Sequence, residues 1–481
     1  MDRTTQQYDD FPPLVIDLDG TLIRSDLLIE SFFVLMASKP FAALKSLGSL
    51  GIGKAALKAR IADNAVIDLH TLPMNETLLD LIRVERKNGR KVFLASASNR
   101  LYVEALADHL GIFDGVFYSD GERNLSGRTK AQILVEAFGR GGFDYAGNSC
   151  ADIPVWECAR AILVVNASKS LFDRVKRRFS DRDVTYLSPT NQSIRQYLHA
   201  LRAHQWAKNV LIFIPLFAAH QFNLHSFILG ILAFCSFCFC ASSVYILNDL
   251  IDLRADRLHH SKRHRPFASG EIPMLHGLIL QPLLLLAAGG VALALPWRFS
   301  IVLVGYYALT LGYSLSLKRF AVIDLMSLSC LYCARIVAGS EAATVPLTPW
   351  LIAFSIFLFF SLATVKRMTE LLKNIDRKQG NPLGRGYHLT DVAVLQVMAA
   401  ASGYIAVLVL ALYINSSKVH ALYTSPEYLW GTCLILLVWI SQVLLLTHRG
   451  QMHDDPVVFA IKDRFSQIAF VLVIFIFIIS I

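Results

Sequence analysis

The sequence predicts a chain of two parts: an N-terminal α/β domain with a helical cap, and a C-terminal all-α membrane domain of nine transmembrane helices. Its 481 residues are 54% hydrophobic, which is too apolar for an ordinary soluble protein, and the chain is too long for one domain. Residues 1–200 mix polar and apolar positions, whereas the rest consists mostly of apolar runs long enough to cross a bilayer. Alternate connections between these runs are rich in lysine and arginine, as the positive-inside rule requires.

The N-terminal part begins with a short apolar stretch that ends in two aspartates, P-P-L-V-I-D-L-D-G-T-L. Ligands of α/β folds bind at the carboxyl ends of parallel strands. Alternation along an extended strand places Asp17 and Asp19 on the same side. This D-x-D-G-T-L resembles the first motif of the haloacid dehalogenase (HAD) superfamily. The resemblance implies a Rossmann-like phosphatase domain in which Asp17 is the nucleophile and Asp19 the general acid or base.

Three further stretches resemble the same superfamily. A second buried strand ends in hydroxyls, R-K-V-F-L-A-S-A-S, where Ser96 matches the residue that binds the transferring phosphoryl group. A helix opens with G-R-T-K-A-Q-I-L, where Lys130 matches the charge-neutralising lysine. The stretch F-D-Y-A-G-N-S-C-A-D matches the acidic motif, with Asp152 in place but Asn148 where the family has its first aspartate.

The HAD resemblance implies Mg²⁺ held by Asp17, Asp19, Asn148 and Asp152. An amide oxygen coordinates Mg²⁺ without a formal charge, so we expect a lower metal affinity than in the family. Two interpretations stay open, an active phosphatase and a weakened scaffold that anchors a partner or senses phosphate. Residues 25–88 are helical in pattern and resemble the cap that selects substrates in this superfamily.

The boundary between the two parts is expected near residue 190, because Y-L-S-P-T-N-Q-S over residues 186–193 carries residues typical of linkers. We therefore predict a HAD-like domain at 1–190 and a membrane domain at 191–481. Most of the 8 cysteines lie in apolar segments with no histidine to complete a zinc set, so we expect neither zinc nor disulfides.

The membrane domain is predicted to cross the bilayer nine times. The expected spans are 209–222, 226–247, 274–295, 299–317, 322–342, 348–366, 390–414, 428–447 and 465–481. Basic residues gather in the even-numbered connections, which predicts a cytoplasmic HAD domain and an external C-terminus in a bacterial-type plasma membrane. We therefore expect the basic residues behind the net charge of +9 to set the membrane topology and to bind phosphate, not to bind nucleic acid.

The densest polar motif follows the second predicted span, Y-I-L-N-D-L-I-D-L-R-A-D-R-L-H-H-S-K-R-H-R-P-F-A-S-G. Steps of three and four put Asp249, Asp252 and Asp256 on one face of a continuing helix. Ligand sets made only of oxygen suit Mg²⁺, and the cations that follow suit a phosphate-rich substrate. The alternative is a solvated charged loop, but ionisable residues grouped at a membrane boundary are usually functional.

This motif, N-D-x-x-D-x-x-x-D from Asn248, resembles the first aspartate-rich motif of the UbiA superfamily of intramembrane prenyltransferases. It continues into K-R-x-R-P with Lys262 and Arg265, as in the decaprenyl-phosphate phosphoribosyltransferase branch of that superfamily. The resemblance covers roughly residues 193–481. It implies Mg²⁺ held by Asn248 and the three aspartates, with phosphoribosyl diphosphate (PRPP) and a polyprenyl phosphate lipid as substrates.

Two other stretches, L-R-x-H-Q-W-x-K-N and K-R-x-x-E-L, resemble the same branch, and a third, Y-S-x-x-L-K, resembles the wider superfamily. The first of them could instead lie as an amphipathic helix on the membrane surface. Arg335 falls inside a predicted span, where a guanidinium costs about 2.5–3.5 kcal/mol on insertion scales. It is expected to pair with Asp324 or Glu341, or to bind a lipid or sugar phosphate. The substrate-binding residues predicted in this domain are Lys208, Asn209, Lys262, Arg265, Lys318, Arg335, Lys366, Arg367 and Tyr387.

The expected activity is transfer of 5-phosphoribose from PRPP to the lipid. The HAD domain would then remove the 5-phosphate, giving polyprenyl-phosphoryl ribose for arabinose donor synthesis. The alternative is an aromatic prenyltransferase acting on 4-hydroxybenzoate. The second D-x-x-x-D of that class is incomplete here, because Leu328 stands four residues after Asp324. The sequence leaves open whether the chain forms a homo-oligomer.

Overall fold

The computed structural model describes residues 11–51, 53–120, 123–187, 193–378, 380–381, 385–452 and 456–481. They fall into two compact units. The first unit is Met1–Ala203 with Tyr245–Pro282, and the second is His204–Val244 with Leu283–Ile481. The boundary predicted near residue 190 lies outside the described residues. The stretch that carries the aspartate-rich motif thus belongs to the same compact unit as the α/β domain.

Among the described residues, the first unit is built around a parallel sheet of six strands in the order β3-β2-β1-β4-β5-β6. Its strands are β1 (Leu14–Ile16), β2 (Val92–Asn99), β3 (Gly115–Ser119), β4 (Asp144–Gly147), β5 (Ile162–Val165) and β6 (Val184–Leu187). The strands are short and apolar because both faces of the sheet are covered. Since β1 pairs with β2 on one side and β4 on the other, the segments that follow these three strands meet at one edge.

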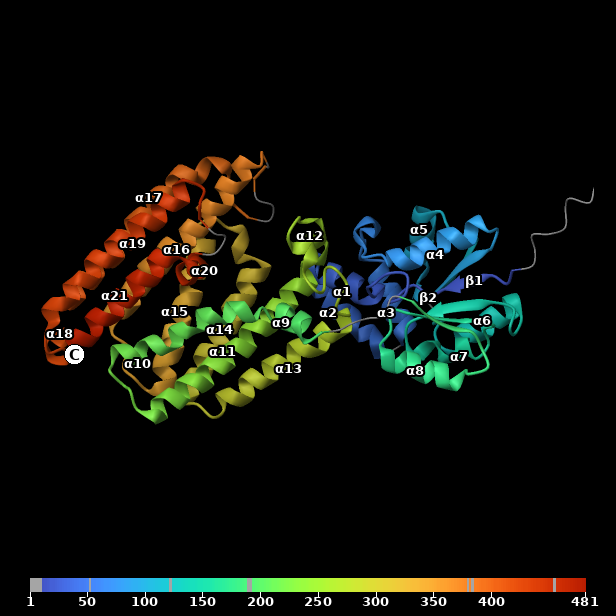
Figure 1. The fold of residues 1–481 in the computed structure, drawn as a ribbon, viewed down its shortest axis with the longest axis horizontal. Coiled ribbons are helices and arrows are strands. Elements are labelled where there is room, and N and C mark those ends of the chain that lie inside the picture. Colours follow the sequence, from blue (N-terminus) through green and yellow to red (C-terminus); the bar gives the residue numbers. More distant parts are fainter. Residues whose placement is uncertain are drawn as a thin grey trace, which may run out of the picture. The chain divides into compact units, whose positions relative to one another are not determined.

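Helices cover both faces of this sheet (Figure 1). One face packs against Leu78 of α4 and Val103 of α5, and the other packs against Leu134 of α6 and Trp156 of α7. The helices of this domain outside the cap are α4 (Glu76–Lys87), α5 (Arg100–Leu110), α6 (Arg128–Phe138), α7 (Ile153–Trp156) and α8 (Lys169–Arg178). The predicted α/β domain with a parallel sheet is confirmed.

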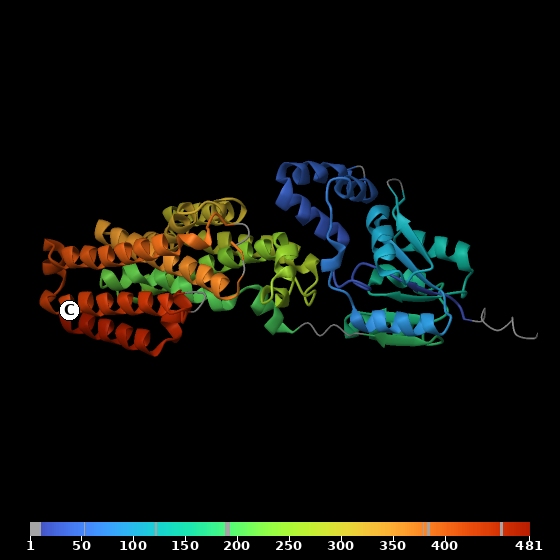
Figure 2. The same ribbon diagram turned by 90° about the horizontal axis from the view of Figure 1, so that it is seen from above.

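A small helical cap is inserted after β1 (Figure 2). It consists of α1 (Leu27–Ser38), α2 (Pro40–Leu47) and α3 (Lys54–Ala62), followed by a 3-10 helix, η2 (Leu69–Thr71). Leu35 and Ile61 belong to a core of the cap's own. The predicted cap extends to residue 88, but α4 packs on the sheet through Leu78 and Ile82. The cap is therefore shorter than the sequence suggested.

The first unit also contains the aspartate-rich stretch. It includes α9 (Ile194–Ala200), the end of α11 (Leu224–Ile251), α12 (Leu253–Leu258), the 3-10 helix η5 (Lys262–His264) and the start of α13 (Met274–Ala292). The predicted continuous helix is interrupted at Asp252. The helical spacing nevertheless carries across the break, because the Asp252 N–H donates to Asn248 O (2.9 Å) and the Asp256 N–H donates to Asp252 O (2.8 Å).

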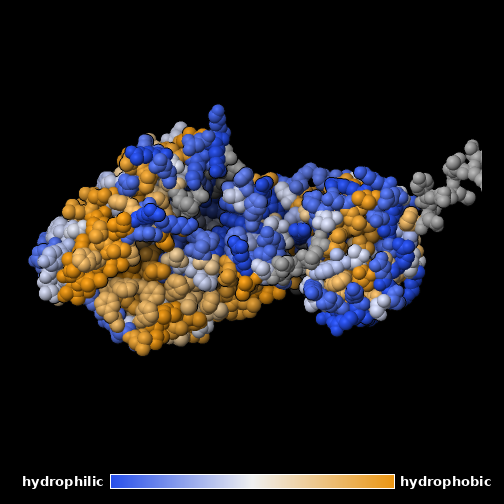
Figure 3. All heavy atoms as spheres, viewed as in Figure 1, coloured by the Kyte–Doolittle hydropathy of each residue, from blue (hydrophilic) through white to orange (hydrophobic). Residues whose placement is uncertain are grey.

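The second unit is helical throughout its described residues. Its further elements are the 3-10 helix η4 (Ala203–Phe213), α10 (Ile214–Ala218), α14 (Trp297–Leu315), η6 (Leu317–Arg319), α15 (Ile323–Ala343), α16 (Pro349–Asp376), η7 (Leu389–Asp391), α17 (Val392–Ile414), α18 (Ser417–Leu422), η8 (Pro426–Leu429), α19 (Trp430–His448), α20 (Pro456–Lys462) and α21 (Arg464–Ser480). Figure 3 shows apolar side chains spread over the surface of these helices. Leu286, Val304 and Phe470 are among the exposed ones, as expected of a surface that meets lipid.

Six helices of the described chain are long and apolar enough to cross a membrane. They are Leu224–Ile251, Met274–Ala292, Ile323–Ala343, Pro349–Asp376, Leu389–Ile414 and Pro426–His448. A seventh is added if α20 and α21, bent by 79° at their junction, count as one span. The predicted span at 209–222 is instead η4 followed by the short α10, and the one at 299–317 is α14, which is not among the six. The multi-span domain is confirmed, whereas the count of nine is not.

Candidate active sites

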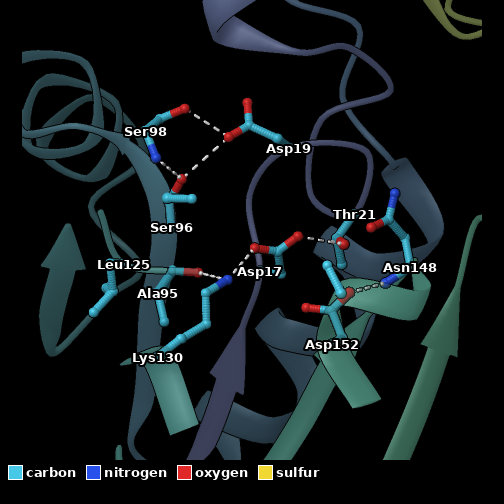
Figure 4. A network of polar contacts seen from close by, with 12 residues as sticks. Asp17, Asp19, Thr21, Ala95, Ser96, Ser98, Leu125, Lys130, Asn148 and Asp152 are labelled. Carbon is cyan, nitrogen blue, oxygen red and sulfur yellow. Dashed lines mark hydrogen bonds and ion pairs between the residues drawn. The ribbon is translucent and has the colours of Figure 1, made fainter. Parts of the chain in front are cut away.

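The HAD-like residues gather where β1, β2 and β4 end (Figure 4). Asp17 follows β1, Ser96 lies in β2, and Asn148 follows β4. Lys130 comes from the first turn of α6. Three neighbouring strands and one helix thus bring together residues that are far apart in the sequence.

Lys130 is buried beside the predicted nucleophile. Its Nζ donates to Asp17 Oδ1 (2.6 Å), to Ala95 O (3.1 Å) and to the Tyr145 hydroxyl (3.0 Å). The other oxygen of Asp17 accepts from Thr21 Oγ1 at 3.0 Å. Burial raises the pKa of Asp17 to about 7, although the charge of Lys130 opposes this rise. The lysine therefore keeps a buried carboxylate ionisable near neutral pH.

Asp19 is held apart from Asp17 by hydroxyl groups. Its Oδ2 accepts from Ser96 Oγ (3.2 Å) and Ser98 Oγ (2.6 Å), and its Oδ1 accepts from the Leu27 N–H (2.9 Å). Because β1 already ends at Ile16, strand alternation does not set the direction of either aspartate. Burial and then the charge of Asp26 raise the pKa of Asp19 to about 6. A carboxyl group with such a pKa can both give and take a proton near neutral pH.

The acidic motif after β4 forms a tight turn around Asp152. Its Oδ2 accepts from the N–H groups of Asn148 (3.1 Å) and Ser149 (3.0 Å), and its Oδ1 accepts from the Tyr145 hydroxyl (2.9 Å). The Asn148 side chain lies over Gly20, where an added Cβ would be 2.0 Å from Nδ2. Gly20 therefore makes room for the amide next to the first motif.

A magnesium ion fits part of the predicted ligand set. Burial, and after it the nearby charge of Asp152, raise the pKa of Asp17, and a divalent cation would relieve that repulsion. Two carboxylates and the amide oxygen of Asn148 are ligands that Mg²⁺ accepts. The Asp19 carboxylate is turned toward the serines instead. Within the described ranges, no three acidic, histidine or cysteine side chains converge as a ready-made metal cluster.

In the aspartate-rich stretch, two acids converge on one arginine. Arg265 Nη1 donates to Asp249 Oδ1 (3.1 Å) and to Asp256 Oδ2 (2.6 Å), and both carboxylates are buried. Arg202 also pairs with Asp249 and lies over the ring of Tyr245, 4.9 Å from its centroid. Burial raises the pKa of Asp256, while the charge of Arg265 opposes this.

The guanidinium of Arg265 lies between Asp249 and Asp256, so the two acids already bind one positively charged group. Asn248 lies in the last turn of α11, directly before Asp249, and Asp252 lies at the break between α11 and α12, between the two acids of the pair. Lys262 lies half-buried in η5. A magnesium ion bound here would take two carboxylates and leave its other positions to water or substrate phosphates, as is usual for Mg²⁺.

A second polar cluster lies within the second unit around Arg335. Its Nε donates to Asn209 Oδ1 (2.8 Å), its Nη2 donates to the Tyr306 hydroxyl (3.0 Å), and its Nη1 donates to Leu331 O. Lys208 is buried nearby, with Nζ 5.8 Å from the ring centroid of Tyr332. Arg335 lies 5.5 Å from the same centroid. Polar and aromatic groups thus hold two cations inside the helical unit.

Arg367 lies in a different network from the one predicted. It donates to Asp324 Oδ1 (2.9 Å), to the Tyr313 hydroxyl (2.8 Å) and to Glu370 Oε2 (2.7 Å), and it is only 2% exposed. Tyr387 is buried in the core beside Asp324, and its hydroxyl accepts from the Val322 N–H (3.2 Å). Both residues therefore have structural roles here, and their contact with substrate stays a prediction.

The two remaining predicted cations also belong to the second unit. Lys318 is in η6 and Lys366 is in α16, and both are half-buried. Their contact with substrate is a prediction as well.

Three residues that contact the predicted site residues were not themselves predicted from the sequence. Thr21 contacts Asp17, Ser98 contacts Asp19, and Arg202 contacts Asp249. Each lies inside a motif that was recognised for a neighbouring residue. Ser98 has the clearest signal, because it shares a strand face with Ser96 two positions earlier.

The fold and the two sites define a multi-pass membrane enzyme with an α/β domain at its N-terminus. Residues 210–478 match the UbiA prenyltransferase family, and residues 14–157 match the haloacid dehalogenase-like hydrolases. The chain belongs to the UbiA prenyltransferase family and carries a HAD domain.

Several relatives resemble this chain. The uncharacterized protein y4nM of Sinorhizobium fredii is 39% identical over 460 residues, covering 94% of this chain and 88% of that protein. The nodulation protein NoeC of Azorhizobium caulinodans is 39% identical over 277 residues, 56% of this chain and 89% of its own length. The decaprenyl-phosphate phosphoribosyltransferase of Mycolicibacterium smegmatis is 28% identical over 291 residues, 59% of this chain and 91% of that enzyme. The first of these similarities spans both parts of the chain.

Proposed function

We propose that the chain transfers 5-phosphoribose from PRPP to a polyprenyl phosphate and then removes the 5-phosphate. The observation that carries the first step is the pair of buried carboxylates, Asp249 and Asp256, surrounded by Arg202 and Arg265. Acids that hold a divalent cation, with arginines to grip phosphates, suit a diphosphate donor. The similarity to decaprenyl-phosphate phosphoribosyltransferases supports the same choice of substrates.

In the transfer step, the C1–O bond of PRPP breaks and pyrophosphate leaves with the bonding electrons. An oxygen of the lipid phosphate forms the new bond to C1. This oxygen is already anionic, so the step needs no strong base. Mg²⁺ held by Asp249 and Asp256 would supply charge neutralisation for the leaving group. Arg202 and Arg265 would then be free of the acids and would hold phosphate oxygens.

In the hydrolytic step, a carboxylate oxygen of Asp17 attacks the 5-phosphate. The bond from phosphorus to the sugar oxygen breaks, and Asp19 protonates that oxygen. Water then attacks the aspartyl phosphate, Asp19 accepts the proton, and inorganic phosphate is released. Lys130 and Ser96 would hold the phosphoryl oxygens. The assembled contacts of Asp17, Asp19 and Lys130 favour an active phosphatase over a scaffold, in spite of Asn148.

The aromatic prenyltransferase alternative is less well supported. That reaction uses a second aspartate-rich cluster to bind prenyl diphosphate through metal. In this chain Asp324 is bonded to Arg367 and Tyr313, and position 328 is leucine. Bidentate pairing with a buried arginine leaves this carboxylate poorly placed to bind metal.

The experiment uses the purified full-length chain in detergent with Mg²⁺. It receives either PRPP with decaprenyl phosphate or prenyl diphosphate with 4-hydroxybenzoate, and pyrophosphate release is followed. We expect release only with PRPP, and Asp249→Asn or Asp256→Asn should lower it by about 100-fold or more. Glu271→Gln, an exposed acid of the same stretch, is the matched control. Asp17→Asn should stop the reaction at the phosphorylated lipid. Undiminished transfer by both aspartate variants would refute the proposal.

A further inference from the structure

A buried ion pair within the first unit belongs to neither active site. Arg257 of α12 donates from Nη1 to Glu30 Oε2 (3.0 Å) and from Nη2 to Glu30 Oε1 (2.6 Å). The two side chains are 7% and 4% exposed. The remaining side of the guanidinium is used too, because Nε donates to Ala268 O at 3.0 Å. The pair joins residues that are 227 positions apart in the sequence.

Each end of this pair lies close to one of the two reaction centres. Glu30 is in the first turn of α1, and the first residue of that helix, Leu27, donates its N–H to Asp19 at 2.9 Å. Arg257 directly follows Asp256, which shares Arg265 with Asp249. The pair therefore connects the cap helix next to the predicted general acid with the helix that carries a predicted metal ligand.

Other contacts join the same two segments. Gly270 has φ +74°, and an added Cβ would lie 2.5 Å from Arg24 O. Glycine adopts this conformation without steric cost, and its lack of a Cβ permits the close approach. Ser25 Oγ donates to Glu30 and lies 3.1 Å from Met274 Sδ. The loop after the nucleophile and the stretch after Asp256 are thus fitted to each other over several residues.

Stability alone does not account for a buried pair of this kind. Removing two charges from water costs several kcal/mol per ion, and well-packed apolar residues often serve stability as well or better. What the charged pair adds is geometric: a bidentate arginine fixes the direction and register of its partner. Such a device is useful where two segments must keep one arrangement.

We propose that Glu30 and Arg257 are positioning residues that hold the phosphatase cap on the aspartate-rich segment, so that the phosphorylated lipid is hydrolysed by the chain that made it. This inference rests on the proposed function. It also assigns the phosphatase a substrate class, a membrane-bound phosphate monoester delivered within one chain. Neither residue touches the reacting atoms, so both partial activities should survive the loss of the pair.

The test measures how the share of lipid product that keeps its 5-phosphate depends on protein concentration. Full-length protein in detergent micelles receives labelled PRPP and decaprenyl phosphate, and the share of lipid product that keeps its 5-phosphate is measured at several protein concentrations. Delivery within one chain is independent of protein concentration, whereas release and recapture slows on dilution. The parent should show a low, constant share. In Arg257→Gln and Glu30→Gln the share should rise by about fivefold or more on dilution.

Controls separate this idea from a folding defect and from failure of the proposed function. Pyrophosphate release and hydrolysis of p-nitrophenyl phosphate should stay within about twofold of the parent. Arg254→Gln removes an arginine of the same helix whose pair with Asp68 is exposed, and it should behave as the parent. If the single variants unfold, the double variant Glu30→Gln with Arg257→Gln carries the test, because it leaves no lone buried charge.

The outcomes are distinct. A dilution-dependent share in the pair variants, with Arg254→Gln unchanged, supports the inference. A constant low share in folded pair variants overturns it while leaving the proposed function in place. If the parent forms no lipid product from PRPP, the proposed function itself fails.

Discussion

Lys130 offers the sharpest test of the phosphatase site. Replacing it by methionine keeps most of its volume but removes the charge that contacts Asp17 at 2.6 Å. A charge pair near a protein surface contributes about 4 kcal/mol at 4 Å, and this buried contact is closer. Since 1.36 kcal/mol corresponds to one pKa unit, the pKa of Asp17, about 7 with Lys130 present, should rise by about three.

The consequence is a loss of the nucleophile at neutral pH. With a pKa near 10, about one Asp17 in a thousand would be ionised at pH 7, against about half in the parent, so the hydrolysis of p-nitrophenyl phosphate should fall about 500-fold. The sign of the pH dependence makes the reasoning specific. Each pH unit above 7 ionises about ten times more of the variant's carboxyl, so its rate should climb toward pH 9 while the parent's rate levels off.

The assay needs two controls. Lys91→Met, at an exposed position just before β2, should hydrolyse the ester like the parent. Thermal melting should show that Lys130→Met is folded at the assay temperature. A folded Lys130→Met that works within about tenfold of the parent at pH 7, or that fails to recover with rising pH, would refute the charge argument.

Three further predictions concern other residues. Asn148→Asp restores a formal charge to the expected metal ligands, so half-maximal ester hydrolysis should need about tenfold less Mg²⁺; an unchanged requirement would put Asn148 outside the metal site. Asp324→Leu leaves Arg367 buried without its main partner and should cost about 3–5 kcal/mol, whereas Asp324→Leu with Arg367→Leu should cost less; melting in detergent compares them. Burial opposes ionisation of Asp144, but Arg160 and a second arginine lower its pKa below the ordinary 3.8. Its stabilisation is thus complete above about pH 4 and is lost progressively as the pH falls from there through the lowered pKa, so Asp144→Asn should lower the melting temperature at pH 7 and differ less from the parent at pH 3.

The sequence predicted most of the phosphatase site because its residues follow strand ends. Local sequence determines where a strand ends, and in a parallel sheet the carboxyl ends of neighbouring strands lie at one edge. Asp17 and Ser96 were placed in this way, whereas Asp152 was predicted from the resemblance of its motif to the HAD superfamily. The direction of Asp19 could not be found, because it depends on two serines of another strand and on the N–H of Leu27.

The membrane domain shows what local patterns do not contain. The apolar runs predicted the long helices, since a run of about 20 apolar residues has few other uses. The pairing of cations was not predictable from them. Arg367 lies 43 positions from Asp324, whereas the cation expected to pair with that aspartate was Arg335. Only the packing of helices decides which guanidinium reaches which carboxylate.

The fusion of the two domains has a physical consequence beyond the ion pair. A short flexible connection alone gives two sites on one chain an effective concentration of about a millimolar, far above the concentration of separate enzymes. If the tether were sufficient, a buried and fully bonded pair between cap and aspartate-rich segment would add nothing. The pair should therefore supply orientation. Its loss should leave the higher effective concentration that comes from having both sites on one chain. The parent should release the least lipid that still carries its 5-phosphate, and Arg257→Gln should release an intermediate amount. A mixture of Asp17→Asn and Asp249→Asn chains, which must pass the lipid between molecules, should release most.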